Sequence, residues 1–227
     1  MSYLRSAHER AAYRRVVYGN SDVYGNKLEI RDGALLEQTE RALTDRRALQ
    51  GFPARANHCS FAGYKAIHRH LFQDLYAWAG TERQYTSCRG PLPFAVPLHI
   101  AAWMVRQFAD LERDRYLVGR TLDGFADAAA RYVNEINAAH PFIDGNGRTQ
   151  RFWLRMLADN AGYNLTLTDA DRQPWNEASR QGFVDSNHAP MAALLGQRLK
   201  PHASSSSAPG RPLARKRRTK RQGRSAD

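Results

Sequence analysis

Apolar residues recur every three to four positions along most of the chain, which is the period of an amphipathic helix and not of a strand. Thr121 is suited to the N-cap of one helix, and Gly162 to the position that follows the end of another. The helices expected from the pattern cover residues 32–49, 61–78, 98–116, 122–140, 148–161 and 175–199, the last range as one helix or two. The predicted fold class is therefore mostly α, a helical bundle.

Each expected helix carries an apolar stripe that predicts the side it buries in the core. Because residues three and four positions apart share a helix face, the stripes also predict which side chains pack together. The expected buried stripes contain Leu35, Leu36, Thr39, Ala42 and Leu43 in the first helix; Tyr64, Ile67, His68, Leu71, Leu75 and Trp78 in the second; Ile100, Val105, Phe108 and Leu111 in the third; and Leu122, Phe125, Ala126, Ala129, Tyr132, Val133 and Ile136 in the fourth.

The segment between Gly80 and Pro97 breaks the helical pattern. Its first half, TERQYTSC, alternates as an extended chain does, and the glycine and prolines of RGPLP forbid a helix. We expect a short strand or a β-hairpin that forms a flap among the helices. A lone two-stranded element is marginally stable in water, so we expect this one to pack on something or to bind something.

Positive charge is concentrated at the C-terminal end of the chain. The net charge is +12, and residues 203–227 carry eight Lys or Arg and one acidic residue, which leaves +5 on residues 1–202. The terminal segment, ASSSSAPGRPLARKRRTKRQGRSAD, has almost no side chain to bury, so we expect it to be disordered. The sequence therefore predicts one folded domain, residues 1–202, and a basic tail, residues 203–227.

Composition excludes several classes of protein. Apolar residues make up 42% of the chain, and no apolar run approaches the roughly 18 residues that span a bilayer. The N-terminal segment is charged and lacks the apolar core of a secretory signal. Two cysteines, Cys59 and Cys88, are too few for a disulfide framework. We expect a cytoplasmic protein without a membrane anchor.

The chemistry-bearing residues are densest in residues 140–151, HPFIDGNGRTQR, directly after the fourth expected helix. Gly145 and Gly147 permit positive φ and a close approach of backbone to a ligand, and the next helix turns its free N–H groups toward this loop. Helix N-termini attract phosphate, and Arg148 and Arg151, three positions apart, share a face on which both guanidinium groups can grip one anion. The segment therefore predicts an anion site.

An acidic and a basic group complete the motif. Asp144 would repel a bare phosphate, so its position indicates a Mg²⁺ ion that bridges the carboxylate and a polyphosphate. His140, at the end of the preceding helix, can accept a proton near neutral pH. A base beside a metal-bound polyphosphate indicates phosphoryl or nucleotidyl transfer.

Each part of the motif also has a purely structural explanation. A Gly-Asn-Gly segment alone is usually a tight turn, and a histidine that ends an apolar helix more often packs or caps than catalyses. Arginines in a first helical turn are usually solvated, although they oppose the helix dipole there. The combination at fixed spacing favours a functional site over coincidence.

The motif HPFIDGNGRTQR matches in full the signature HPFx[D/E]GNGRxxR of the Fic family, and the resemblance extends over roughly residues 20–200. YGNKLEIRD resembles the N-terminal part of bacterial Fic toxins, HRHLFQDLYAWAGTERQ resembles their second helix, and CRGPLPFA resembles their flap. The resemblance implies a Fic fold, a helical bundle around a motif-bearing helix pair with a β-hairpin flap. It also implies transfer of AMP from ATP to a Ser, Thr or Tyr hydroxyl of a target protein, with Mg²⁺ as cofactor and release of diphosphate.

Carried over to this chain, the resemblance implies that His140 is the base that deprotonates the target hydroxyl and that Asp144 is the Mg²⁺ ligand. Residues 87–94 would dock the target by adding a strand to it. The implied ATP-binding residues are Asp144, Gly145, Asn146, Gly147, Arg148, Thr149, Gln150 and Arg151 of the motif, with Arg89 and Gly90 of the flap. The implied docking residues are Ser87, Cys88, Arg89, Gly90 and Phe94. In this scheme the Gly-Asn-Gly segment forms the anion hole, Arg148 binds the β-phosphate and Arg151 binds the γ-phosphate. The GNGR part of the motif is intact, which favours AMP transfer over phosphate transfer.

Fic proteins are commonly inhibited by a helix that bears [S/T]xxxE[G/N], whose Glu pairs with the second Arg of the motif. No Ser or Thr in this sequence is followed by Glu four residues later. We therefore expect the toxin-like class, whose inhibitor is a separate small antitoxin that inserts an acidic helix beside Arg151. By analogy with that class, a type II topoisomerase subunit is the expected target.

Two other functions fit the same sequence. A nucleic-acid-binding protein would act through the basic tail and retain the motif as a relic, and a related Fic enzyme would transfer another nucleoside monophosphate or phosphocholine. The tail is compatible with nucleic-acid binding, nuclear localisation, translocation into another cell, or a solvated segment with weak affinity for polyanions. The sequence leaves these alternatives open.

Overall fold

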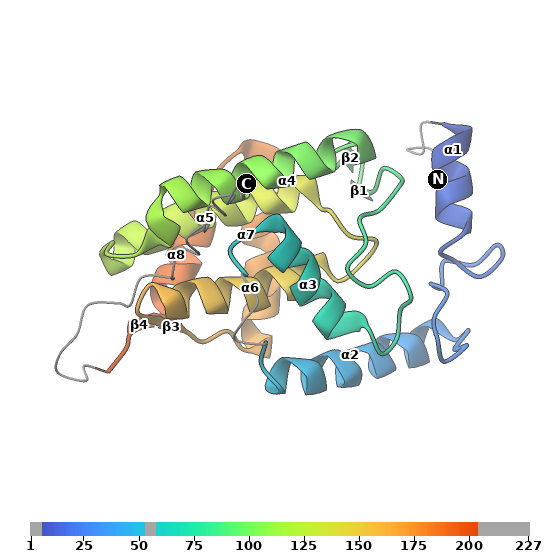
Figure 1. Ribbon diagram of the computed structural model, residues 1–227, viewed down its shortest axis with the longest axis horizontal. Coiled ribbons are helices and arrows are strands. Elements are labelled where there is room, and N and C mark those ends of the chain that lie inside the picture. Colours follow the sequence, from blue (N-terminus) through green and yellow to red (C-terminus); the bar gives the residue numbers. More distant parts are fainter. Residues whose placement is uncertain (1–5, 53–57, 204–227) are drawn as a thin grey trace, which may run out of the picture.

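The computed structural model describes residues 6–52 and 58–203 (Figure 1). Helices dominate this part of the chain, which confirms the mostly α fold class. They are α1 (Ala7–Arg14), α2 (Gly33–Leu49), α3 (Phe61–Phe72), α4 (Pro97–Arg113), α5 (Leu122–Ala139), α6 (Asn146–Asn160), α7 (Arg172–Asp185) and α8 (Ala189–Arg198), with the short 3-10 helices η1 (Arg115–Leu117) and η2 (Asp169–Asp171). None of the helices in the described ranges is both long and apolar enough to span a bilayer. The predicted basic tail lies outside the described residues apart from Ala203, so it stays a prediction.

Two small antiparallel sheets accompany the helices. The strands are β1 (Cys88–Arg89), β2 (Leu92–Pro93), β3 (Tyr163–Leu165) and β4 (Leu199–Pro201). Cys88 of β1 lies opposite Pro93 of β2, and Tyr163 of β3 lies opposite Pro201 of β4. The β1–β2 pair confirms the hairpin predicted between residues 80 and 97, and residues 87–94 are called the flap from here on. The β3–β4 pair has no counterpart among the sequence predictions.

Side-chain caps begin two of the helices where the sequence predicts them. Asp32 Oδ1 accepts a hydrogen bond from the N–H of Leu35 at 2.8 Å, and Thr121 Oγ1 accepts one from Gly124 at 3.2 Å. Each such cap stabilises its helix by about 1 kcal/mol. Beyond the end of α6, Gly162 has a φ of +91°, a conformation that favours glycine and stops the helix as predicted.

The helix α5 lies at the centre of the core. Ala128, Ala129 and Ala130 follow one another and are all fully buried, so neighbours surround this helix on every side. It packs against α4, α6, α7 and α8, and the small alanine side chains permit their close approach. The helix α3 packs on α6, α2 runs beside α3, and α1 stands at the edge of the domain near β1 and β2 (Figure 1). The chain between α5 and α6 carries the predicted motif.

The structure corrects the expected helices in three places. The helix α3 ends at Phe72, and Trp78 is half-buried from a turn, which periodicity cannot tell from a helix. Leu35 is 51% and Val105 58% exposed, because the buried face of α2 is rotated from the expected stripe and Met104 takes the place of Val105 in that of α4. The predicted residues Leu36, Ile100, Phe108 and Leu111 are buried, and the buried faces also carry Glu40 and Thr44 in α2 and Met104 in α4. The first helix, α1, is not among the predictions.

Candidate functional site

The predicted motif forms the loop between α5 and α6 and the first turns of α6. His140 ends α5 in the left-handed conformation (φ 44°, ψ 61°), and Gly145 precedes α6 at φ 75°. Between them, Phe142 is fully buried, with its ring centroid 5.6 Å from that of Tyr64 and 3.9 Å from that of His68. This aromatic anchor fixes the middle of the loop, and the two left-handed residues turn the chain on either side of it.

Asn146 clamps the loop from the first position of α6. Its Oδ1 accepts a hydrogen bond from the N–H of Phe142, and its Nδ2 donates one to the carbonyl of the same residue, both at 2.9 Å. The side chain is 8% exposed and shapes the loop, and Nδ2 keeps a second N–H, so the predicted contact of Asn146 with phosphate stays a prediction. The N–H groups in the first turn of α6 are the remaining anion-binding groups here.

Both glycines of the motif leave space for a neighbouring side chain. A Cβ atom at Gly145 would lie 2.2 Å from Cζ of Phe72, so a larger residue cannot enter without displacing that ring. A Cβ atom at Gly147 would lie 3.3 Å from Nη1 of Arg151, which places this guanidinium over the N-terminal turn of α6. The glycines therefore serve packing as well as backbone conformation.

His68 of α3 supports the loop from behind. Its Nδ1 accepts a hydrogen bond from the N–H of Gly80 at 2.7 Å, so Nε2 carries the proton and donates it to the carbonyl of Asp144 at 3.0 Å. Burial lowers the pKa of His68 to about 3, against the opposing effect of that carbonyl, and the ring is neutral at pH 7. The apolar stripe predicts His68 as a core residue, but its contact with the motif spans 76 positions and has no local signal.

A pocket of about 820 Å³ opens at the N-terminal end of α6, between α2, α6 and η2. Its charged lining includes Asp144, Arg148, Arg151, Arg155 and Arg172, with Glu37, Glu40, Arg41 and Asp169. Burial, followed by repulsion from the neighbouring arginines, lowers the pKa of Arg151 to about 10. Its guanidinium lies 5.8 Å from the ring centroid of Trp175, and within the described ranges it forms no ion pair. A half-buried guanidinium without an ion-pair partner in the described ranges is suited to bind an anionic ligand.

Glu40 of α2 is a site residue that no sequence motif indicates. It is 5% exposed, accepts a hydrogen bond from the hydroxyl of Tyr76 and forms an ion pair with Arg148. Arg148 also lies over the ring of Phe72, 4.8 Å from the centroid. These contacts hold the Arg148 guanidinium at the pocket wall. The available sequence signal is an acid four positions after the buried Leu36, because carboxylates seldom occupy a buried helix face unless they are paired.

Asp144 also faces the 820 Å³ pocket. Burial raises its pKa above the ordinary value, and the charge of nearby Glu40 adds to this. Its Oδ1 accepts a hydrogen bond from the N–H of Gly145 at 2.6 Å. The described part of the chain contains no group of three or more His, Cys, Asp or Glu side chains that could hold a metal ion. A cation at Asp144 would therefore take most of its ligands from a bound molecule.

The ring of His140 lies under the flap. It stacks on Phe94 with 3.9 Å between centroids and 7° between planes, and Phe94 packs on Phe183 of α7. Burial, followed by the charges of Arg83 and Arg89, lowers the pKa of His140 to about 3. The imidazole is therefore neutral at pH 7, which is the protonation state that a general base needs.

The flap lies on the His140 side of the loop. Gly90 has a φ of +58° in the exposed turn between β1 and β2, and the N–H of Phe94 donates to the carbonyl of Ser87 at 3.0 Å. Arg89 is half-buried, with its guanidinium 5.8 Å from the ring centroid of Phe94, and Cys88 beside it is partly buried. Neither Arg89 nor Gly90 lines the 820 Å³ pocket, and the charge of Arg89 acts on His140, so their predicted contact with ATP stays a prediction.

Two motif residues that are predicted to bind ATP lie in the helix packing instead. Thr149 is fully buried, and its hydroxyl donates to the carbonyl of Gly145 at 3.0 Å. Gln150 is 3% exposed, and its Nε2 donates to the carbonyl of Val133 at 2.6 Å. These side chains join α6 to the loop and to α5. Their predicted contact with ATP stays a prediction, to which these side-chain contacts add no support.

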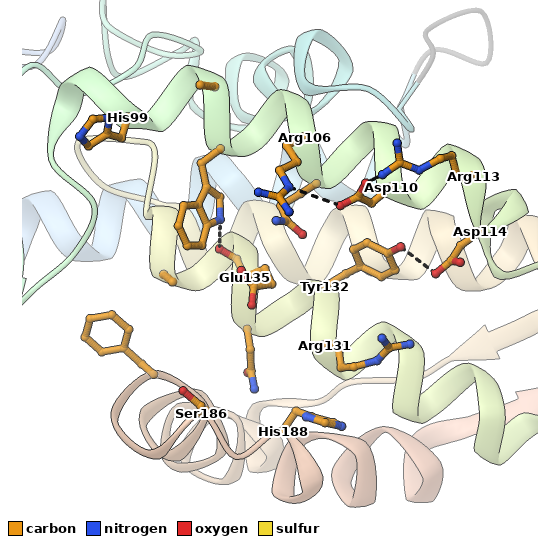
Figure 2. A pocket seen from close by; sticks show the side chains of 17 residues that line it. His99, Arg106, Asp110, Arg113, Asp114, Arg131, Tyr132, Glu135, Ser186 and His188 are labelled. Carbon is orange, nitrogen blue, oxygen red and sulfur yellow. Dashed lines mark hydrogen bonds and ion pairs between the residues drawn. The ribbon is translucent and has the colours of Figure 1, made fainter.

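A second pocket, of about 1050 Å³, lies between α4, α5 and the turn from α7 to α8 (Figure 2). Trp103 donates its indole N–H to the carbonyl of Glu135 at 3.1 Å, and the Tyr132 hydroxyl donates to Asp114 at 2.8 Å. The residues that line this pocket include none of residues 140–151. Although it is larger than the pocket at α6, it lacks the motif's chemistry.

Several known proteins resemble this chain in sequence. Residues 59–158 match the model of the Fic/DOC family. The "Probable protein adenylyltransferase y4lH" of Sinorhizobium fredii is 37% identical over 179 residues, which cover 78% of this chain and 92% of that protein. The "Probable protein adenylyltransferase Fic" of Escherichia coli is 33% identical over 176 residues, which cover 74% of this chain and 84% of that protein.

Solved structures share the fold. The BepC protein of Bartonella tribocorum, solved with bound AMPPNP, has a TM-score of 0.77 and 22% identity, over 87% of this chain and 100% of that chain. The N-terminal Fic domain of a VirB-translocated effector from Bartonella quintana, solved with bound ADP, has a TM-score of 0.74 and 26% identity, over 83% of this chain and 95% of that chain. The predicted Fic fold is confirmed. Since the Sinorhizobium relative exceeds 30% identity and aligns over nearly its full length, the chain belongs to the Fic/DOC family.

Proposed function

We propose that the protein transfers AMP from ATP to a Ser, Thr or Tyr hydroxyl of another protein and releases diphosphate. The observation that carries the proposal is that one loop has a neutral base at one end and an anion-binding helix terminus at the other. His140, a neutral imidazole, lies under the flap, and the N-terminus of α6 with Arg148 and Arg151 faces the 820 Å³ pocket. The names of the relatives and the nucleotides bound to the structural neighbours support the same activity.

The triphosphate of ATP suits the pocket side of the loop. Free N–H groups and the dipole at the N-terminus of α6 favour phosphate. Arg148 is suited to the β-phosphate and Arg151 to the γ-phosphate, because both guanidinium groups line the pocket that opens at this helix end. The net charge of +5 on residues 1–202 adds a general attraction for a polyanion.

Asp144 suits a Mg²⁺ ion. Its carboxylate is a hard oxygen ligand in the same pocket as the two arginines, and Mg²⁺ in nucleotide sites is usually held by one or two carboxylates together with substrate phosphates. A cation would also relieve the repulsion between this carboxylate and Glu40. When bound, the ion would neutralise charge on the phosphates that face Asp144.

The transfer step requires the target hydroxyl between the flap and His140. The flap would hold an extended segment of the target as an added strand. The hydroxyl oxygen then forms a bond to the α-phosphorus, the bond from that phosphorus to the oxygen that bridges to the β-phosphate breaks, and diphosphate leaves. The hydroxyl proton passes to the neutral ring of His140. The negative charge of bound nucleotide raises the pKa of this ring toward the range in which it retains the proton.

Label transfer tests the proposal directly. The protein is incubated with cell lysate and ATP labelled at the α-phosphate or, in parallel, at the γ-phosphate. We expect α-label and no γ-label on a target protein, and we expect His140→Ala to abolish labelling while it leaves binding of an ATP analogue largely intact. Continued α-labelling by His140→Ala contradicts the role of the base, and γ-labelling indicates phosphorylation.

The same assay separates the alternative functions. Competition by UTP, GTP or CDP-choline against labelled ATP identifies transfer of another nucleotide or of phosphocholine. Salt-dependent DNA binding without label transfer, retained in His140→Ala, supports the nucleic-acid-binding alternative that depends on the basic tail.

We also propose that the protein is toxin-like and is inhibited by a separate small antitoxin. Glu40 pairs with Arg148, and no carboxylate in the described ranges pairs with Arg151, which leaves that arginine available to an acidic helix. Co-expression with the neighbouring open reading frame should give a complex that does not transfer label. A type II topoisomerase subunit is the proposed target, in the cytoplasm of the producing cell or, if the tail directs translocation, of another cell. Incubation with purified topoisomerase and mass spectrometry for an AMP adduct tests this.

A further inference from the structure

Arg83 lies between the end of α3 and the flap, and it contacts the motif loop through both backbone and side chain. Its N–H donates to the carbonyl of Pro141 at 2.9 Å, and Glu82 beside it forms an isolated antiparallel bridge with Phe142. The residue is 1% exposed. A fully buried arginine requires acceptors for its five N–H donors, so its partners indicate what the side chain holds in place.

The guanidinium of Arg83 donates four hydrogen bonds, all to backbone carbonyls. Two of the acceptors end α5: the carbonyl of His140 at 2.7 Å from Nε and that of Ala139 at 3.1 Å from Nη2. The other two flank the flap: the carbonyl of Tyr85 at 2.5 Å from Nη1 and that of Ala95 at 2.5 Å from Nη2. One planar group therefore joins the residue that bears the base to the chain on both sides of the flap.

The backbone of His140 needs such support. Its φ of 44° places it in the left-handed region, which destabilises a residue with a Cβ by about 1 kcal/mol or more. The last carbonyls of α5 also carry the negative end of the helix dipole, where a cation is stabilising. Arg83 supplies both the positive charge and a donor to the His140 carbonyl, so it favours the strained conformation that aims this ring at Phe94.

We propose that Arg83 is a positioning residue that sets the flap and His140 in one fixed relation, so that a hydroxyl held on the flap meets the base. The role rests on the proposed AMP transfer, in which the flap holds the target and His140 accepts the proton. Arg83 touches neither reactant in this scheme and acts through the two elements that it joins.

The substitution Arg83→Lys isolates this role. Lysine keeps the positive charge near the carbonyls at the end of α5, but its single ammonium cannot reach four acceptors that a planar fork spans. A displacement of the flap by about 1 Å relative to the base is expected to lower the rate of transfer by about 100-fold. The affinity for an ATP analogue should change by less than about threefold, because Arg83 does not line the 820 Å³ pocket.

Two measurements distinguish positioning from general support of the fold. Steady-state transfer should show a lower kcat with little change in KM for ATP. Hydrogen exchange should become faster in residues 84–96 and stay unchanged in α3 and α6, and this readout does not depend on activity. Arg47→Lys is the matched control, since it breaks a bidentate pair with Asp74 away from the loop and the flap. That variant should keep its kcat and its flap protection, and it should lose little thermal stability because the pair is partly exposed.

The outcomes decide between the explanations. The proposal fails if Arg83→Lys keeps wild-type kcat and flap protection, or if exchange rises uniformly over the domain. If Arg83→Lys does not fold, Arg83→Gln is measured in the same way, and failure of both to fold shows that Arg83 supports the whole domain and overturns the positioning role. If the wild-type protein transfers no α-label to any protein, the proposed function is wrong, and hydrogen exchange still shows whether Arg83 couples the flap to the end of α5.

Discussion

Replacement of Gly145 by alanine should destabilise the domain through two separate effects. The φ of +75° costs a residue with a Cβ about 1–2 kcal/mol. The new Cβ would also lie 2.2, 2.5 and 2.9 Å from three ring atoms of Phe72, and such overpacking costs about 1–3 kcal/mol. Phe72 is 1% exposed, stacked on His68 and covered by Arg148, so it has no open direction in which to move.

The expected loss for Gly145→Ala is therefore about 2–5 kcal/mol, and a domain of this size loses about 2–4 °C of melting temperature per kcal/mol. Circular dichroism melts and urea titration measure it. Gly119→Ala is the control for backbone strain, since Gly119 has a φ of +82° and no atom within 4 Å of its Cβ position. That variant should lose about 1–2 kcal/mol.

A double substitution separates the steric effect from the strain. Phe72→Leu removes the ring atoms that the new Cβ would meet, so Gly145→Ala should cost less in that background than in the wild type. The packing explanation of Gly145 is wrong if Gly145→Ala is no less stable than Gly119→Ala, or if Phe72→Leu does not reduce the stability that Gly145→Ala loses. The remaining explanation of this glycine would then be a close approach of the backbone to phosphate.

Three further predictions concern the site. Acidification from pH 7 to pH 5 should lower the free energy of unfolding by about 2 kcal/mol through His68. In the unfolded chain this imidazole has a pKa near 6.5 and binds a proton in this range, whereas in the folded protein its pKa is about 3 and it does not. His68→Asn should remove this part of the pH dependence of the melting temperature, and an unchanged slope would show that the ring is not buried as a neutral group. Glu40→Gln keeps an acceptor for the Tyr76 hydroxyl but breaks the ion pair with Arg148. Its free energy of unfolding, measured by urea titration, should fall by about 1–2 kcal/mol. Glu40→Ala, which also leaves the Tyr76 hydroxyl without that acceptor, should lose about 1–3 kcal/mol more, and equal stability of the two variants would count against the buried hydrogen bond. Arg151→Ala should weaken ATP-analogue binding by about 10- to 100-fold in calorimetry, since a hydrogen bond to a charged group contributes about 1.5–3 kcal/mol. AMP binding should change less, and an equal loss for AMP would place Arg151 away from the γ-phosphate.

The sequence predicts those parts of the fold that depend on local chemistry. The helix boundary at Thr121 follows from capping within one turn, and the hairpin around Gly90 follows from prolines and a glycine that exclude a helix. The motif loop is predicted because its residues are contiguous. Some of its contacts are also local, since the two hydrogen bonds of Asn146 to Phe142 span four positions.

The parts that the sequence does not predict depend on contacts between distant segments. Glu40 meets Arg148 across 108 positions and Arg83 meets the His140 carbonyl across 57, and no local pattern specifies either contact. The packing of Gln150 is also unpredicted, since its side chain donates to the carbonyl of Val133 in α5, 17 positions away. Motif spacing indicates the helix and the loop but not which motif residues face the pocket.

The double hydrogen bond of Asn146 to the backbone of Phe142 has a consequence for affinity. Because both polar groups of Phe142 are satisfied by the protein itself, the loop holds its shape with no nucleotide present. Preorganised sites lose little conformational entropy on binding, so most of the interaction energy between phosphate and the amides of α6 can appear as affinity. The clamp therefore helps to set how tightly the nucleotide is held, by fixing the loop before the nucleotide binds.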